Sequence, residues 1–272
     1  MLEIRNLSLA YGKTRVLQNV SLPAVSDGAL VGVLGPNGAG KSTFLRAVAG
    51  QSTYSGSILF EGREVSRLPH RERTRHIGFM PQSPPNTSGF VAYELVVSSC
   101  RSARPDLTAT EVANSAEAVF GYLQLQELAF RPLSRMSGGQ RQLVGLAQIL
   151  VRDPKVLLLD EPSSALDLKW QVTVFEILRK RLVERGGLCL VALHDLNLAI
   201  RYCDLVAIMR GGRCIAYGPP AQALTPTVLR DAYDVSGRVE TCSRGQPIVI
   251  VDGGEDVALE TQTPIRKVSG EP

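Results

Sequence analysis

The stretch ALVGVLGPNGAGKST, residues 29–43, decides the fold of this chain. Its apolar run, Ala29–Leu34, is typical of a buried strand and ends in a glycine-rich loop. The pattern G-x-x-x-x-G-K-[ST] at Gly35–Ser42 stands between that strand and a helix expected from Lys41, which is the context in which it binds phosphate. Backbone N–H groups and the positive end of the helix would hold the phosphate oxygens. We therefore predict a nucleotide site, with Lys41 on the β- and γ-phosphates and Ser42 on Mg²⁺.

The residues of this loop that we expect to contact nucleotide are Gly35, Pro36, Asn37, Gly38, Ala39, Gly40, Lys41, Ser42 and Thr43. Tyr11, near the end of the first expected strand, is predicted to stack on the adenine ring. The alternative for such an aromatic residue is a place in the core. Its position in the chain favours stacking.

Other short apolar runs repeat the buried-strand pattern further along the chain. They are Val156–Leu159, Leu188–Leu193 and Leu205–Met209, with helical segments between them. This alternation predicts a mostly parallel sheet with helices on both faces. Residues 2–10 and 16–22 alternate apolar with polar side chains and predict an antiparallel pair joined by a turn at Gly12.

Residues 92–152 have a helical pattern and are predicted to be a helical subdomain inserted into the sheet domain. Thr108 and Glu111 form a capping box ahead of one helix, and a second helix from Gly138 is expected to end near Asp153. After Gly211 we expect a strand, one helix carrying Leu224 and Leu229, and a hairpin near 248–251. The chain thus reads as one α/β domain over 1–252, with a polar tail at 253–272 that we expect to be flexible.

Two carboxylates follow the strand at 156–159. Asp160 is placed to hold magnesium, and Glu161 is placed to polarise the attacking water, a form of assistance worth roughly 10²–10⁴ in rate. An Asp-Glu pair at this point can also be an ordinary solvated start of a loop. The presence of the phosphate-binding loop in the same chain favours the catalytic interpretation.

Gln82 and His194 are further candidates, each close after an expected strand. Gln82, in FMPQ, is placed to reach both the metal and the water; alternatively it is a surface residue. His194, in VALHD, is placed to contact the γ-phosphate; alternatively it is a hydrogen-bonded structural residue.

The segment Ser137–Gln140, SGGQ, stands at the start of an expected helix. Its N–H groups and the Ser137 hydroxyl would form an anion site. The alternative is an ordinary capped helix, with Ser137 at the cap and glycines that allow a tight approach. That alternative accounts for Ser137, but it gives no reason for the two glycines, Gly138 and Gly139, which weaken a helix start.

Composition narrows the class of protein. The 272 residues are 44% hydrophobic and 21% charged, with a net charge of +4 and no run of five basic residues, so we expect no nucleic-acid partner. Five cysteines without a C-x-x-C pair suit a reducing compartment. The amino terminus reads as a strand and not a signal peptide. Apolar runs are far shorter than the roughly 20 residues that cross a bilayer, so a partner would have to supply any membrane role.

These motifs, in this order, resemble the nucleotide-binding subunit of an ATP-binding cassette (ABC) transporter over roughly residues 2–235. The resemblance implies the following assignments: Walker A at Gly35–Thr43, a Q-loop at Gln82, the signature at Ser137–Gln140, Walker B at Val156–Asp160, Glu161 as catalytic base, a D-loop at Ser164–Asp167 and a switch histidine at His194. Met136 stands where the family usually has Leu, a volume-conserving change.

The resemblance also implies the assembly. In that family two cassettes pack head to tail, and each ATP, with Mg²⁺, lies between the Walker A loop of one chain and the signature of the other. The D-loop, including Asp167, lies in that interface. The implied partners are a second copy of the chain, polytopic membrane permease subunits and, indirectly, a substrate-binding protein. The implied location is the cytoplasmic face of the inner membrane, as a peripheral subunit.

Residues 192–212 and 217–235 resemble the importer subgroup that takes up iron–siderophore complexes, haem and cobalamin. This subgroup gives the leading hypothesis, an ATPase that drives bacterial uptake of a metal chelate. Two alternatives keep the same ATP chemistry: an exporter subunit or a subunit for another cargo, and a soluble ABC ATPase without a membrane partner.

Overall fold

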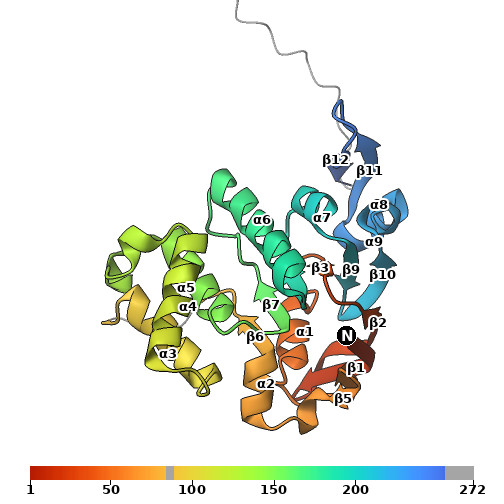
Figure 1. Cartoon of the computed structure of the whole chain (residues 1–272). Helices are drawn as coiled ribbons and strands as arrows, with labels where there is room; N and C mark the ends of the chain where they lie inside the picture. The colour runs from red at the N-terminus through yellow and green to blue at the C-terminus, as the bar shows by residue number, and fades with distance from the viewer. Residues whose placement is uncertain (84–88, 255–272) are drawn as a thin grey trace, which may run out of the picture.

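The computed structural model describes residues 1–83 and 89–254, which form three sheets and the helices that cover them (Figure 1). The central sheet has the strand order β10-β9-β3-β8-β7-β6. These strands are β3 (Leu30–Leu34), β6 (Ile77–Met80), β7 (Val156–Asp160), β8 (Leu188–Ala192), β9 (Leu205–Arg210) and β10 (Arg213–Gly218). All neighbours are parallel except β10, which runs antiparallel to β9. The carboxyl ends of β3, β6, β7 and β8 therefore meet at one edge, where ligands of such sheets bind.

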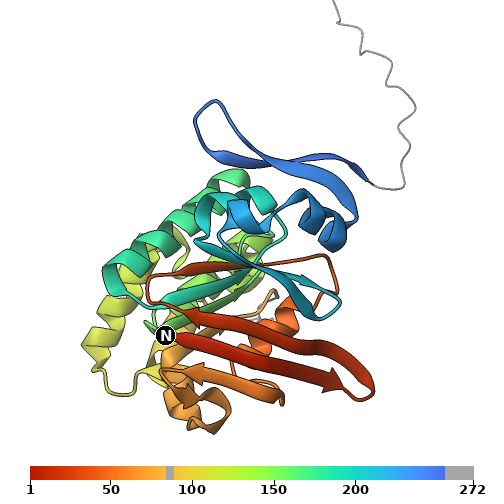
Figure 2. The ribbon, with the colours of Figure 1, turned by 90° about the vertical axis from the view of Figure 1, so that its right-hand side faces the viewer.

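An antiparallel sheet with the order β2-β1-β4-β5 covers part of one face of the central sheet (Figure 2). Its strands are β1 (Leu2–Tyr11), β2 (Thr14–Val25), β4 (Ser55–Phe60) and β5 (Arg63–Glu64). Helix α1 (Lys41–Val48) packs in the same layer, and α2 (His70–His76) precedes β6. The layer is held by the apolar side of each alternating strand, as the amino-terminal pattern predicts.

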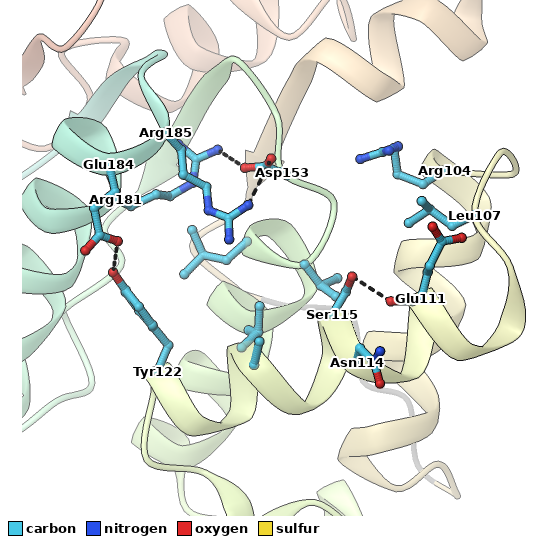
Figure 3. A pocket seen from close by; sticks show the side chains of 14 residues that line it. Arg104, Leu107, Glu111, Asn114, Ser115, Tyr122, Asp153, Arg181, Glu184 and Arg185 are labelled. Carbon is cyan, nitrogen blue, oxygen red and sulfur yellow. Dashed lines mark hydrogen bonds and ion pairs between the residues drawn. The ribbon is translucent and has the colours of Figure 1, made fainter.

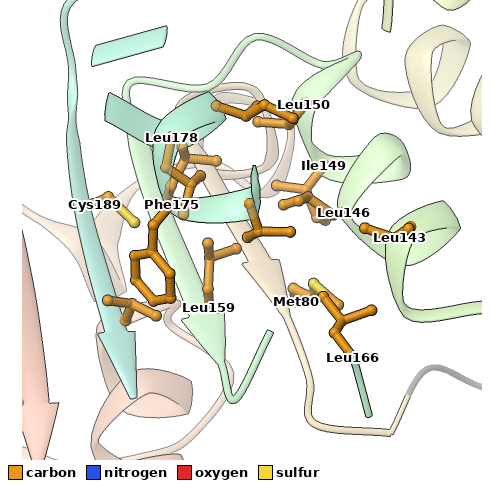
Figure 4. Close-up of a cluster of buried hydrophobic side chains, with 14 of the residues drawn as sticks. Met80, Leu143, Leu146, Ile149, Leu150, Leu159, Leu166, Phe175, Leu178 and Cys189 are labelled. Atoms are coloured by element: carbon orange, nitrogen blue, oxygen red, sulfur yellow. The ribbon is translucent and has the colours of Figure 1, made fainter. Parts of the chain in front are cut away.

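The side chains of β7 contribute to two hydrophobic clusters, one on each face of the central sheet. Val156 and Leu158 join the cluster under the antiparallel sheet and α1, whereas Leu157 and Leu159 join the cluster on the opposite face. That second cluster is built with α6 (Leu168–Arg185) and α7 (Leu196–Tyr202), and Figure 4 shows part of it. Both faces of the strand are buried, which explains its unbroken apolar sequence.

The helical insertion contains α3 (Ala92–Ala103), α4 (Ala109–Tyr122) and α5 (Gly138–Leu150), with short 3₁₀ turns at Gln126–Leu128 and Leu133–Arg135. The predicted capping box is present: Thr108 accepts the N–H of Glu111, and Glu111 accepts the N–H of Thr108. Helix α5 ends at Leu150, before the expected Asp153. The fold class is confirmed, including the antiparallel subdomain and the inserted helices.

The carboxyl-terminal region differs from expectation in two ways. Where one helix was expected, there are α8 (Pro220–Ala223) and α9 (Pro226–Tyr233), because Thr225 caps a new helix with Pro at its first position. The expected hairpin is β11 (Val235–Thr241) and β12 (Pro247–Gly254), and β12 extends two residues past the domain end placed at 252. Residues 255–272 of the expected tail lie outside the described residues.

The hairpin packs on the core through Val249, and one side chain of α7 adds hydrogen bonds to it. The Asn197 amide donates to the Val249 carbonyl at 3.3 Å and accepts its N–H at 2.8 Å. This pairing continues the β-type hydrogen bonding of β12 onto the helix that follows His194.

Phe175 offers a direct test of the core described above. Its ring is 0% exposed and stacks on Tyr202 with ring centroids 5.2 Å apart. We expect Phe175→Ala to lower the free energy of unfolding by about 3–5 kcal/mol, because it leaves a cavity in a packed face. Denaturant unfolding measures the change. Val183→Ala, on the same helix with its side chain 86% exposed, should change it by less than about 0.5 kcal/mol. Equal effects would show that α6 does not form this core.

Candidate nucleotide site

The phosphate-binding loop joins β3 to α1, and its close packing explains its first glycine. Gly35 has φ 141°, and a Cβ there would lie 2.2 Å from the Met209 carbonyl oxygen. A side chain at this position would push the loop off β9, so only glycine lets the backbone turn here.

Lys41 begins α1 with its ammonium folded back into the loop. It is 6% exposed, and its Nζ donates to the carbonyls of Gly35 at 2.7 Å and Pro36 at 3.1 Å. Burial lowers the pKa of Lys41, and the nearby carboxylates of Glu161 and Asp160 oppose that shift. The side chain is thus a partly desolvated cation at the centre of the loop, suited to an anionic ligand.

Asp160, at the end of β7, lies against the Ser42 hydroxyl. Ser42 Oγ donates to Asp160 Oδ1 at 3.0 Å, whereas Asp160 Oδ2 is buried and has no hydrogen-bond partner. Burial is the main cause of the raised pKa of Asp160. A buried carboxylate oxygen without a partner, beside a hydroxyl, is a donor set that suits magnesium.

Within residues 1–83 and 89–254, no three His, Cys, Asp or Glu side chains gather as a metal cluster. A magnesium ion here would therefore take its other ligands from phosphate oxygens and water, as it commonly does at nucleotide sites.

Glu161 lies at the point where three strands end, and both of its carboxylate oxygens have partners. Gln82, after β6, donates from Nε2 to Oε2 at 2.7 Å, and His194 Nε2, after β8, contacts Oε1. Glu161 is 9% exposed and has φ 52°, a left-handed conformation that costs about 1–3 kcal/mol outside glycine. Strain of this size persists where the surrounding structure imposes it.

A cavity of about 440 Å³ lies beside these residues. It is lined by Val16, Asn37, Gly38, Ala39, Gly40, Lys41, Ser42, Thr43, Gln82 and Glu161. The structure thus brings most of the predicted phosphate-binding loop together with Gln82 and Glu161. Val16 was missed because an apolar residue in a strand carries no chemical signal.

Other predicted residues lie outside this lining. Among the described residues, the predicted site residues that do not line the cavity are Tyr11, Gly35, Pro36, Ser137–Gln140, Asp160, Asp167 and His194. Tyr11 is 52% exposed at the end of β1. Asp167 caps α6, where its carboxylate accepts the Trp170 N–H at 3.0 Å.

The signature segment begins α5 with a second capping box. Ser137 Oγ accepts the N–H of Gln140 at 3.2 Å, and Gln140 Oε1 accepts the N–H of Ser137 at 3.0 Å. The hydroxyl proton of Ser137 remains available to donate to an acceptor, because this bond uses only an oxygen lone pair.

The capped-helix alternative attributed the glycines of this segment to a tight approach, and the structure shows such an approach at Gly139. A Cβ on Gly139 would lie 2.9 Å from the Ala165 carbonyl oxygen and 3.2 Å from a methyl of Leu166. Gly139 therefore allows α5 to approach the loop after Glu161, which is a packing reason that spacing alone does not reveal.

Gln142 is the main residue of the site region that the sequence analysis missed. It is 3% exposed on α5, and its amide group bonds to the loop that carries Glu161. A glutamine directly before the apolar run LVGLA of the same helix is the signal that would have singled it out.

A second cavity, of about 390 Å³, lies between α4, the end of α5 and α6, and shares no lining residue with the first (Figure 3). Asp153 pairs there with Arg181 and Arg185, and Tyr122 donates to Glu184 at 2.8 Å. The cavity lies between the helical insertion and the helix α6 of the sheet core.

The fold and the site define a P-loop nucleotide-binding protein with an inserted helical subdomain. Comparison with known proteins agrees: residues 17–164 match the family described as "ABC transporter". The chain is 37% identical over 263 residues to a hemin import ATP-binding protein of Pseudomonas fluorescens, covering 92% of this chain and 99% of that protein. It is 34% identical to a cobalamin import ATP-binding protein of Halobacterium salinarum, covering 99% and 68%.

Among solved structures, the chain resembles a dimeric, post-hydrolysis state of the ATP-binding cassette MJ0796 bound to ADP and Pi. The TM-score is 0.72 at 26% identity, covering 81% of this chain and 99% of that one. The chain belongs to the ABC transporter family, as an ATP-binding cassette. Membership of this family implies ATP binding and hydrolysis.

Proposed function

We propose that this chain hydrolyses ATP in a head-to-tail pair and that the pair drives import of a metal chelate. One observation supports the proposed ATP hydrolysis: Lys41, Ser42 and Glu161 line the same cavity, whereas Ser137 lies outside it. A site with a phosphate cradle and a carboxylate, but without the signature, is complete only when another surface supplies that segment. The second copy of the chain supplies it.

In this proposal the residues in and around the cavity have separate tasks. The loop from Gly35 to Thr43 holds the phosphates, with the Lys41 cation on the β- and γ-phosphates. Glu161 accepts a proton from the attacking water, while Gln82 and His194 orient the carboxylate and sense the γ-phosphate. Tyr11 stacks on the adenine, and Asp167 lies at the interface with the partner.

Magnesium would be held by Ser42 and by Asp160, directly or through water. When bound, the ion supplies charge neutralisation at the β- and γ-phosphates. The unpartnered Oδ2 of Asp160 and the hydrogen bond from Ser42 to its Oδ1 support this assignment.

The transport part rests on the relatives. One of these relatives is named as a hemin import protein and another as a cobalamin import protein. The match to the hemin import protein covers nearly the full length of that protein and of this chain. We propose haem, cobalamin or an iron–siderophore complex as cargo, all of them large metal chelates. None of the helices in residues 1–83 and 89–254 is both long and apolar enough to cross a bilayer. Permease subunits would provide the membrane passage, with this chain on the cytoplasmic face of the inner membrane and a binding protein delivering cargo.

Affinity purification of the Glu161→Gln variant with ATP, from gently solubilised native membranes, tests the assembly. We expect mass spectrometry to find polytopic membrane subunits in a two-to-two complex. Recovery with soluble partners or nucleic acid alone would overturn the importer assignment and leave the ATPase standing.

The recovered permease then allows the cargo to be tested. Proteoliposomes holding the complete transporter should hydrolyse ATP several-fold faster with a binding protein loaded with haem, cobalamin or a ferric siderophore than with the same protein unloaded. Stimulation by none of these chelates would contradict the proposed cargo class.

A further inference from the structure

A single buried side chain joins the signature helix to the loop that carries Glu161. Gln142 Nε2 donates to the Glu161 carbonyl at 2.6 Å and to Ser164 Oγ at 3.3 Å. At its other end, Gln142 Oε1 accepts the N–H of Ala165 at 3.0 Å. The amide of a side chain that is 3% exposed is therefore satisfied at both ends by residues 161–165.

The loop needs such support because of its backbone. Glu161 has φ 52°, and it directly follows the buried strand β7. Its carbonyl accepts from Gln142 and also from Ser164 Oγ at 3.1 Å, which itself contacts Gln142. Since the backbone of Glu161 sets where its carboxylate points, the groups that fix this carbonyl also fix the carboxylate.

A second contact ties the same two elements together. Gly139, one turn before Gln142 on α5, packs so closely on the Ala165 carbonyl that a Cβ would come within 2.9 Å of it. The start of α5 and residues 161–165 thus meet through a packing contact as well as hydrogen bonds. Displacing either element alone would break both.

We propose that Gln142 is a positioning residue. It keeps the Glu161 carboxylate and the D-loop in a fixed position relative to the signature of the same chain. The inference rests on the proposed role of Glu161 as base. In a head-to-tail pair, Glu161 serves the chain's own ATP and Ser137 serves the partner's ATP. Gln142 therefore links the two nucleotide sites through one helix.

The first test is Gln142→Met, which keeps the length of the side chain and removes its hydrogen bonds. We expect kcat for ATP to fall about 10- to 100-fold, because a carboxylate displaced by about 1 Å loses that much. The KM for ATP should stay within about twofold, since the phosphate-binding loop is untouched. Gln148→Met is the matched control: the same change on the same helix, at an amide that donates to Ser99 Oγ at 3.4 Å. Its kcat should be unchanged.

The second variant, Gln142→Glu, keeps the shape and remains testable if the first fails to fold. The new carboxyl can still accept the Ala165 N–H, but it donates to the Glu161 carbonyl only when protonated. Burial raises the pKa of such a group. We therefore expect kcat, relative to the unsubstituted protein at each pH, to rise as the pH falls through that pKa. A role limited to packing would give a ratio that does not change with pH.

Parallel assays of Glu161→Gln separate the two proposals. Full turnover in Glu161→Gln would refute the assigned base and with it this inference. Loss of turnover in Glu161→Gln, together with a kcat of Gln142→Met equal to that of Gln148→Met and a flat ratio for Gln142→Glu, would overturn the inference alone.

Discussion

Glu161→Gln should lower ATP turnover about 10²- to 10⁴-fold, the range that general-base assistance supplies. The substituted amide keeps the size of the side chain but cannot take a proton from water. One carboxylate oxygen of Glu161 accepts from Gln82 at 2.7 Å, and the other contacts His194. An amide can keep one of these contacts through its oxygen, so we expect the loop to keep its conformation.

ATP binding should survive the same substitution, because the phosphate-binding loop and Lys41 belong to other elements. The measurements are steady-state hydrolysis and equilibrium nucleotide binding on the same preparation. With hydrolysis blocked, ATP and magnesium should also convert the variant into a stable dimer, which size-exclusion chromatography with light scattering resolves. Gln148→Met is a suitable control, since its amide donates to Ser99 Oγ and not to the loop that carries Glu161. Turnover in Glu161→Gln equal to that of the unsubstituted chain would exclude Glu161 as the base.

The parts of the site that were predictable from sequence are those that one continuous segment specifies. The phosphate-binding loop needs a buried strand, glycines and a helix start in direct succession, and residues 29–43 contain all three. The apolar runs that became β7, β8 and β9 are dry on both faces, so their composition alone identified them. Gln82 and His194 were each singled out because they follow an expected strand closely, and in the structure both contact the carboxylate of Glu161.

What the sequence did not predict depends on contacts between segments. Gln142 reaches Glu161 across 19 positions only because α5 packs on the loop after β7. The requirement for Gly139 comes from the Ala165 carbonyl on that same loop. The left-handed backbone of Glu161 is a local strain that its surroundings impose. Glutamate is not a residue type that indicates this conformation, so the sequence did not reveal it. The break between α8 and α9 is different, because it follows from a local signal that the sequence analysis overlooked: Thr225 caps a new helix with Pro226 at its first position.

A mixture of two inactive variants should regain ATP hydrolysis if the signature acts on the partner's nucleotide. Lys41→Ala removes the cation of the phosphate-binding loop. Ser137→Asp keeps an acceptor for the Gln140 N–H, so α5 remains capped, but it directs a negative charge at the phosphate. Each variant alone should lose at least about 10²-fold in turnover, the typical loss when one donor to a transition-state oxyanion is removed.

In a mixed pair, the Ser137→Asp chain contributes an intact Lys41 and the Lys41→Ala chain contributes an intact Ser137. These two meet at one of the two sites of a head-to-tail dimer. With random pairing, single-turnover hydrolysis should recover to about a quarter of the level of the unsubstituted protein, because half of the dimers are mixed and each has one intact site. If each chain instead used its own signature, the mixture would stay as inactive as its components.

The doubly substituted chain, with Lys41→Ala and Ser137→Asp together, gives a control in which mixing should lower the activity. Mixed with the unsubstituted chain, it forms dimers in which one site lacks the cation and the other lacks the serine, so neither site is intact. Hydrolysis should therefore fall below that of an equal amount of the unsubstituted chain alone. Signatures acting within one chain would leave one intact site in every mixed dimer, and no fall would be observed. The geometry favours the first outcome, because Ser137 does not line the cavity that Lys41 and Glu161 share.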